Sequence, residues 1–121
     1  MNSESLILQL TEIFKLLGDP TRLRIAMLCL HERVSVGTMG DPTRLRIAML
    51  CLHERVSVGT IAERLDLSVS LVSHHLRLLR AARILRAERE GKQVFYAAAD
   101  HHVRRILDDM SAHILESHED V

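Results

Sequence analysis

Four side chains near the C-terminus are of types that bind metal ions, and they fall into two pairs. Asp100 and His102 form one pair, and His113 and Glu116 form the other. The eleven residues from His102 to His113 return to nearly the same helix face, because each residue turns a helix by about 100°. They also advance about 16 Å along the axis, whereas a first-row metal ion bonds its ligands at about 2 Å. One straight helix therefore cannot bring both pairs to one ion.

Two copies of this helix, antiparallel across a two-fold axis, would bring the pairs together. Asp100 and His102 of one subunit would face His113 and Glu116 of the other, and symmetry would create two identical sites. The spacing thus predicts a homodimer with metal at its seam. Two imidazoles and two carboxylates complete a tetrahedron without an open position, which suits Zn²⁺ in a regulatory or structural role, and Co²⁺ would bind similarly. The alternative is that all four are exposed polar residues beside a dimer stripe.

The elements that must position these residues follow from apolar spacing and capping residues. Apolar residues from Leu6 to Leu17 recur at helical intervals. Asp-Pro pairs at 19–20 and 41–42 each predict a helix start, and these helices should run to about Glu32 and Glu54. The helical period returns from about His101 to Ser117. Most of the chain is therefore expected to be α-helical.

The middle of the chain predicts a winged helix-turn-helix. A short helix over Ile61–Leu65 and a break at 66–68 precede a second helix from Val69 to about Ala82. Ser68 is its expected N-cap, and Leu71, Val72, Leu76 and Leu79 are expected to face inward. Strands over 84–89 and 93–97, joined at Glu90-Gly91-Lys92, would form the wing. The predicted fold class is mostly α with a small β-hairpin wing, as a homodimer.

Residues 18–39 and 40–61 are two copies of one 22-residue segment, differing only at Met39 against Ile61. Two units are too few for a solenoid, so we interpret the repeat as a tandem duplication within one domain, residues 1–121. A natural duplication, an introduced one and a sequence error all fit. The second copy runs directly into Ile61 and is expected to fill the core, which leaves one copy supernumerary. The reverse arrangement is nearly isoenergetic, because the copies match.

Composition limits the functions that this chain can have. Its 121 residues are 47% hydrophobic, carry no net charge and contain no Trp. Basic residues exceed acidic ones by seven to four over 60–96, so the middle of the chain can face a polyanion. Cys29 and Cys51 occupy the same position in the two copies and form no CxxC pair, which fits a reducing cytoplasm. No membrane span, signal segment, nucleophile elbow, HExxH or phosphate loop is found, so neither a membrane protein nor an enzyme is expected.

The second helix of the predicted motif and the wing carry side chains suited to DNA. Ser and His can donate to base edges or phosphates, and Arg serves either role. The candidate DNA-binding residues are Ser68, Ser70, Ser73, His74, Arg77 and Arg80 from the helix and Arg86, Arg89 and Lys92 from the wing. The alternative is an amphipathic helix with a solvated charged face.

The chain resembles the ArsR/SmtB family of metal-responsive bacterial repressors. The matching segments are GDPTRLRI, LSVSLVSHHLRLLR, EGKQVFYAAADHHV and the D-x-H…H-x-x-E set in the last helix. The resemblance implies a homodimer joined through its first and last helices, with Asp100, His102, His113 and Glu116 as zinc ligands. It further implies that the metal-free dimer binds double-stranded operator DNA and that zinc lowers this affinity, releasing metal-efflux or sequestration genes. The region around 56–60 reads VSVGT without cysteine, which argues against a thiolate site for softer ions.

The sequence leaves two alternatives to zinc sensing open. One is a winged-helix repressor whose signal is not a metal, for example oxidation of the cysteine. The other is a variant whose function the duplication impairs.

Overall fold

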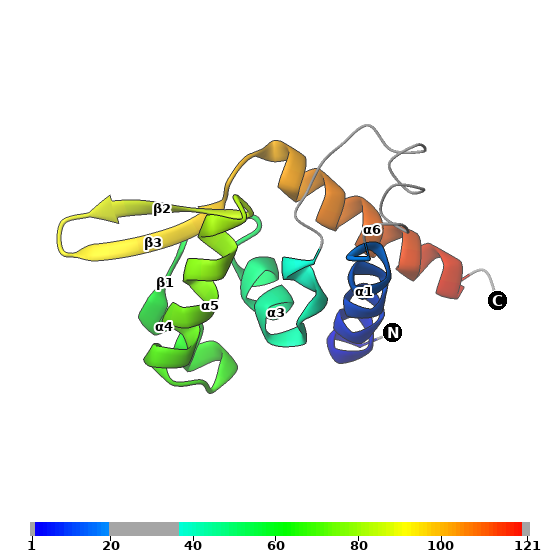
Figure 1. Ribbon diagram of the computed structural model, residues 1–121, viewed down its shortest axis with the longest axis horizontal. Coiled ribbons are helices and arrows are strands. Elements are labelled where there is room, and N and C mark those ends of the chain that lie inside the picture. Colours follow the sequence, from blue (N-terminus) through cyan, green and yellow to red (C-terminus); the bar gives the residue numbers. More distant parts are fainter. Residues whose placement is uncertain (1, 20–36, 120–121) are drawn as a thin grey trace.

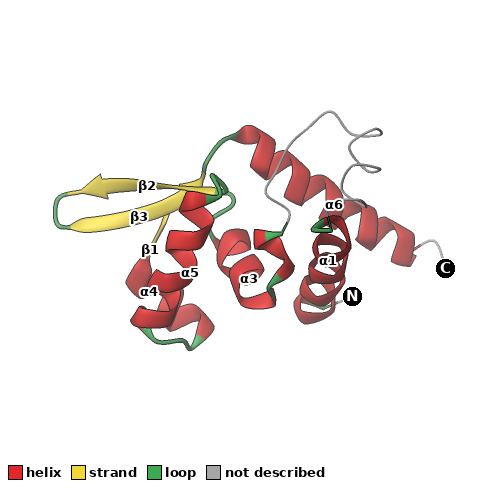
Figure 2. Cartoon of the chain, viewed as in Figure 1, coloured by secondary structure: helices red, strands yellow, loops and turns green. Residues whose placement is uncertain are grey.

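The computed structural model describes residues 2–19 and 37–119 (Figures 1 and 2). Helices dominate, and one small antiparallel sheet projects from them (Figure 2). In chain order the elements are α1 (Ser3–Leu17), the 3-10 turn η1 (Thr38–Gly40), α3 (Pro42–Leu50), β1 (Val56–Ser57), α4 (Val58–Leu65), α5 (Val69–Ala81), β2 (Leu85–Glu90), β3 (Gln93–Ala98) and α6 (His101–Glu119). None of the helices in the described ranges is long and apolar enough to cross a membrane.

Short polar side chains start these helices, as the sequence predicts for two of them. Asp41 accepts a hydrogen bond from the backbone N of Arg44 at 2.9 Å, with Pro42 at the first position of α3. Ser68 accepts from the backbone N of Leu71 at 3.1 Å at the start of α5. Each cap satisfies a backbone donor that has no partner inside the helix. The turn between α4 and α5 is made by Asp66, whose φ of 54° is left-handed.

Two predicted helix boundaries are wrong. The helix expected to reach Glu54 ends at Leu50, and the helix expected over Ile61–Leu65 begins earlier, at Val58. Val56 and Ser57 form a short strand, β1, on the outer side of β3, and Ser57 also caps α4. Pairing with a distant strand overrides the local helical period here.

The second copy of the repeat provides the helix at the centre of the core. Leu45, Ile47 and Ala48 of α3 are fully buried, and α3 packs between α1 and α5. Residues 20–36 of the first copy, including its predicted Asp-Pro helix and Cys29, lie outside the described residues. Of the two copies, it is therefore the second that is seen in the core.

Gly18, at the end of α1, and Gly37, before η1, lie beside each other. A Cβ placed on Gly18 would lie 3.4 Å from the Cα of Gly37. The side chain of Met39 is then completely buried, and Gly40 follows it against Lys15 of α1. Met39 thus precedes α3 as Leu17 would in a chain with one copy. The described core is continuous across the junction.

The wing is a three-stranded antiparallel sheet with the order β1-β3-β2. Leu85 to Glu90 pair with Ala98 to Gln93, and Gly91 adopts a φ of 63° in the two-residue turn. Such a turn needs left-handed backbone, which glycine supplies without strain. α6 then packs against α1, so that the start of α1 and the end of α6 lie on the same side of the molecule (Figure 1).

Deleting residues 18–39 should preserve this fold, because Leu17 would then precede Gly40 as Met39 does now. The deletion removes the entropic cost of closing a segment of about twenty residues, which is roughly 2–3 kcal/mol. We therefore expect an equal or higher melting temperature when unfolding is followed by far-UV circular dichroism. Deleting residues 40–61 is the matched control, since its product differs only by Met39 in the place of Ile61. That swap should cost less than about 1.5 kcal/mol. Loss of cooperative unfolding in both variants would contradict a core that needs only one copy.

Candidate functional site

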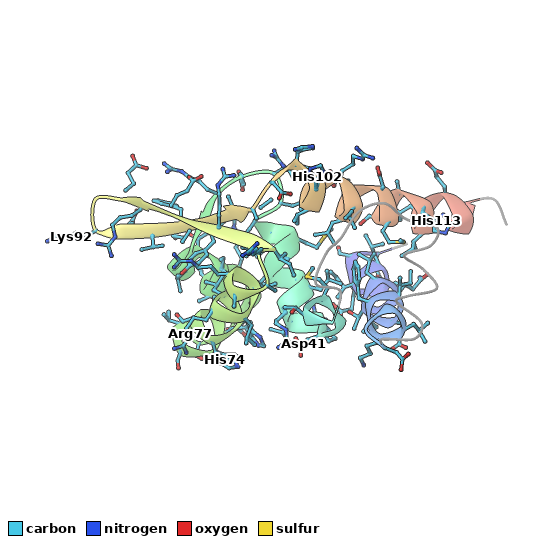
Figure 3. The ribbon with its side chains drawn as sticks, turned by 45° about the horizontal axis from the view of Figure 1, so that its top comes forward. Asp41, His74, Arg77, Lys92, His102 and His113 are labelled. Carbon is cyan, nitrogen blue, oxygen red and sulfur yellow. The ribbon has the colours of Figure 1, made fainter. Side chains whose placement is uncertain are left out.

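The orientation of α5 is set by its buried face. Val72, Leu76 and Leu79 are buried against the core, as predicted. The opposite face is open to solvent, and Figure 3 shows His74 and Arg77 on the side of the molecule away from α6. Of the predicted DNA-binding residues of this helix, Ser68, Ser70, His74, Arg77 and Arg80 are exposed and Ser73 is half-buried.

The inward face of α5 differs from the prediction at one position. Leu71, expected to be buried, is 41% exposed, and His75 is buried in the core instead. Among the described residues, Nδ1 of His75 finds no hydrogen-bond partner. Burial lowers the pKa of His75, with the charge of Asp41 opposing the shift. His75 is therefore a neutral packing residue, whereas its neighbour His74 faces solvent.

The two faces of the wing carry different basic residues. Arg86, Glu88 and Glu90 alternate along β2 and share one face, whereas Leu85 and Arg89 share the other. Leu85 is buried against the core, so Arg89 lies on the core side of the hairpin. Arg86 instead donates from Nε to Oε1 of Glu88 at 3.0 Å. The exposed Lys92 occupies the tip (Figure 3).

Sequence reasoning missed a contribution of the duplicated segment to the wing. Arg55 lies 4.5 Å above the ring of Phe95 and forms ion pairs with Glu88 and Glu90. The edge strand β1 starts at the next residue and places Arg55 across the sheet. No local signal marks Arg55, because its partners are more than thirty residues away in the chain.

The four predicted metal ligands are all exposed and all belong to α6 or its start. Val103, Leu107 and Ile114 are buried and hold one face of α6 on the core. His102 and His113 lie near opposite ends of the helix (Figure 3). Residues 2–19 and 37–119 of one chain contain no cluster of three or more His, Cys, Asp or Glu that could hold an ion. The structure therefore presents the two pairs separately, one at each end of α6.

The geometry of the first pair is compatible with metal binding. Asp100 caps α6 by accepting from the backbone N of Val103 at 3.0 Å through Oδ1, which leaves Oδ2 available. His102 is exposed, with its ring centroid 3.9 Å from that of His101. Carboxylate oxygen and imidazole nitrogen are both ordinary zinc ligands. His113 and Glu116 are three residues apart and share a helix face.

The comparisons with known proteins agree with the fold. A family model described as "Bacterial regulatory protein, arsR family" matches residues 41–87, from the cap of α3 into β2. A "Transcriptional repressor SmtB homolog" of Synechocystis sp. is 35% identical over 109 residues, covering 90% of this chain and 66% of that protein. The chain belongs to the ArsR/SmtB family. This confirms the expected resemblance and the winged helix-turn-helix fold, and the family consists of DNA-binding transcriptional regulators rather than enzymes.

Solved structures similar to this chain include one named as a metal sensor and one whose name mentions no metal. The "cadmium metal-sensor CMTR from Mycobacterium tuberculosis" is 41% identical, with a TM-score of 0.53 over 60% of this chain and 76% of that chain. "Reduced HlyU from Vibrio cholerae N16961" is 32% identical, with a TM-score of 0.58 over 60% of this chain and 77% of that chain. ArsR/SmtB membership by itself therefore leaves the inducing signal open.

A thiol-based signal receives no support from Cys51. The side chain is completely buried, and burial raises its pKa from 9.0 to about 12. The reactive form of a cysteine is the thiolate, so this thiol is chemically quiet at neutral pH.

In a Cys29→Ser chain, iodoacetamide should alkylate Cys51 much more slowly in the native protein than in urea. The same pKa shift predicts a loss of stability at alkaline pH. Above about pH 9 the unfolded thiol loses its proton while the folded thiol keeps it, so stability should fall as the pH rises from 9.0 toward 12. Mass spectrometry of the labelled protein measures the rate at which iodoacetamide alkylates Cys51. Native labelling as fast as labelling in urea would show that Cys51 is accessible after all.

Proposed function

We infer that this chain is a transcriptional repressor that binds operator DNA as a homodimer and responds to a divalent metal at the dimer seam. The observation that carries the DNA-binding part is the open face of α5. Ser70, His74 and Arg77 lie together on a rigid helix, with donors suited to base edges and phosphates. The wing tip, with Lys92, offers a second cationic contact beside it.

The expected binding geometry follows from the helix-turn-helix. α5 would enter the major groove, and the wing would contact the neighbouring backbone or minor groove. A two-fold dimer would present two such helices to successive major grooves, about 34 Å apart. The operator is accordingly expected to be a two-fold symmetric sequence.

Arg77→Ala and Arg89→Ala should each weaken DNA binding. Arg86 was also a candidate from the sequence, but its contacts with Glu88 lead us to expect little effect of Arg86→Ala. Arg86 is held by Glu88 on the opposite face of the wing, so it serves as the matched control. The probe is a duplex selected by the protein from a random library, and anisotropy is measured over a salt series. Loss of one phosphate contact should reduce the slope of log affinity against log salt by about one. Unchanged affinity and slope in both Arg77→Ala and Arg89→Ala would remove α5 and the wing from the interface.

The metal-sensing part rests on the ligand types and their spacing on α6. Asp100 and His102 of one protomer, with His113 and Glu116 of the other, would hold the ion. When bound, zinc would supply coordinate bonds that tie the two α6 helices together. Cobalt suits the same ligands. Because Asp100 also caps α6 and the chain enters α6 directly from β3, a change in how the two α6 helices lie would reach both wings and alter the spacing of the α5 helices. Coupling of a few kcal/mol would suffice to release the operator.

His102→Ala should retain DNA binding and lose its release by zinc. His101→Ala is the matched control, since His101 is the adjacent exposed histidine and is not one of the proposed ligands. Both variants and the parent are titrated with zinc while bound to the selected duplex, and zinc uptake is measured separately by equilibrium dialysis. If His102→Ala leaves the duplex at the same zinc concentration as the parent, the ligand assignment is wrong. If the parent takes up no stoichiometric zinc, the repressor responds to another signal.

A further inference from the structure

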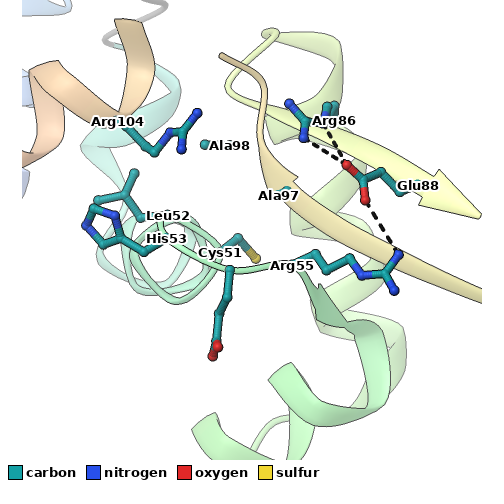
Figure 4. A pocket seen from close by; sticks show the side chains of 10 residues that line it. Cys51, Leu52, His53, Arg55, Arg86, Glu88, Ala97, Ala98 and Arg104 are labelled. Atoms are coloured by element: carbon teal, nitrogen blue, oxygen red, sulfur yellow. Dashed lines mark hydrogen bonds and ion pairs between the residues drawn. The ribbon is translucent and has the colours of Figure 1, made fainter. Parts of the chain in front are cut away.

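A hollow of about 200 Å³ lies where the wing, the end of α3 and the start of α6 meet (Figure 4). Arg86 is the one candidate DNA-binding residue in its lining, and no predicted metal ligand lines it. Three of its lining side chains are arginines, namely Arg55, Arg86 and Arg104, and they come from three different parts of the fold. Ala97 and Ala98 of β3 form an uncharged wall between them. Several guanidinium groups around one small space favour the binding of an anion there.

The carboxylate of Glu88 already neutralises part of this positive charge. Glu88 also lines the hollow and lies between two of the arginines, bonded to Arg86 and paired with Arg55 at 3.6 Å (Figure 4). Arg55 has a second partner in Glu90. The lining carboxylate of Glu54 is paired at 3.6 Å with Arg64 of α4. The carboxylates therefore neutralise Arg55 and most of Arg86.

Arg86 keeps donors that these contacts do not use. Its Nε and Nη2 contact Glu88, and its Nη1 donates to the backbone O of Ala99 at 3.4 Å. A guanidinium has five N–H donors in a fixed plane. One donor on each terminal nitrogen is therefore left for a ligand.

Arg104 is the arginine of the hollow that no carboxylate of the described residues neutralises. The natural partner of Arg104 is Asp108, four residues later on the same helix. Asp108 instead contacts Nε2 of His53 at 3.0 Å. Within the described ranges no ion pair or side-chain hydrogen bond is found for the Arg104 guanidinium. In Figure 4 this group extends from α6 toward Ala98, on the side where Arg86 also lies.

We propose that this hollow binds the phosphate group of a small anion, held between the guanidinium groups of Arg104 and Arg86. The two groups reach the space from α6 and from β2, so they approach a ligand from different directions. A tetrahedral phosphate offers acceptor oxygens in several planes, whereas both oxygens of a carboxylate lie in one. Its charge also matches the surplus that Arg104 and the partly satisfied Arg86 leave. A bound phosphate would contact both the wing and α6, the two elements that the proposed function assigns to DNA and to metal.

The test is calorimetric titration of the metal-free full chain with inorganic phosphate at constant ionic strength, without DNA. Its outcome therefore does not depend on the repressor proposal. Arg104→Gln removes the unpaired guanidinium from an exposed helix position. Arg105→Gln is the matched control, because it changes the net charge equally on the same helix, but Arg105 does not line the hollow. Sodium acetate is titrated in parallel as the planar oxyanion. Backbone amide shifts of Ala97 and Ala98 locate the binding.

We expect saturable binding of one phosphate per chain, with shifts at Ala97 and Ala98 and weaker binding of acetate. Arg104→Gln should weaken phosphate binding at least about tenfold, which corresponds to one charge-assisted hydrogen bond. Arg105→Gln should stay within about twofold of the parent. The proposal is overturned if millimolar phosphate gives no saturable heat, if both variants lose affinity equally, or if acetate binds as tightly as phosphate. It is also overturned if the shifts appear away from the hollow.

Discussion

The space between α1 and α5 accepts a single helix, and the rest of the structure depends on how that space is filled. Leu45, Ile47 and Ala48 of α3 fill it completely, and the buried face of α5 rests on them. A second identical helix cannot be added there, because protein interiors are already close-packed. Gly18 and Gly37 lie side by side before this helix, and the buried Met39 follows Gly37 into the core.

Two backbone hydrogen bonds connect the parts of the molecule that the proposed function needs to couple. The N–H of Ala98 donates to Cys51 O at 3.1 Å, which attaches the wing to the end of α3. The N–H of Ala99 donates to Ile84 O at 3.0 Å, directly after α5. Asp100 follows and caps α6. Asp100 and His102 are thus within a few residues of the bonds that hold both the wing and the segment after α5. A displacement of the start of α6 cannot leave these elements unaffected, because buried backbone bonds of this kind are costly to break.

Much of the fold could be predicted because its signals are local. The caps at Asp41 and Ser68 and the glycine turn of the wing depend on neighbours within three or four residues, and all were expected correctly. Strand β1 was missed, because two residues become a strand only through pairing with Phe95 and Tyr96. The buried face of α5 was misplaced at Leu71 because residue type favoured a leucine over His75. A neutral imidazole packs in the core there, and periodicity cannot distinguish that from an exposed histidine.

The site could be predicted as residue types and spacings but not as contacts. The hollow at the base of the wing illustrates the difference. From the sequence, Arg104 and Asp108 have the spacing of an ordinary helical ion pair, and such a pair would leave no free charge. In the fold, Asp108 instead contacts His53, a residue of the duplicated segment. Arg104 is therefore left without this partner. The same segment places Arg55 over the wing. Residues 29–33 repeat residues 51–55 without change. A chain that placed its first copy in the core would therefore present the same side chains to the hollow.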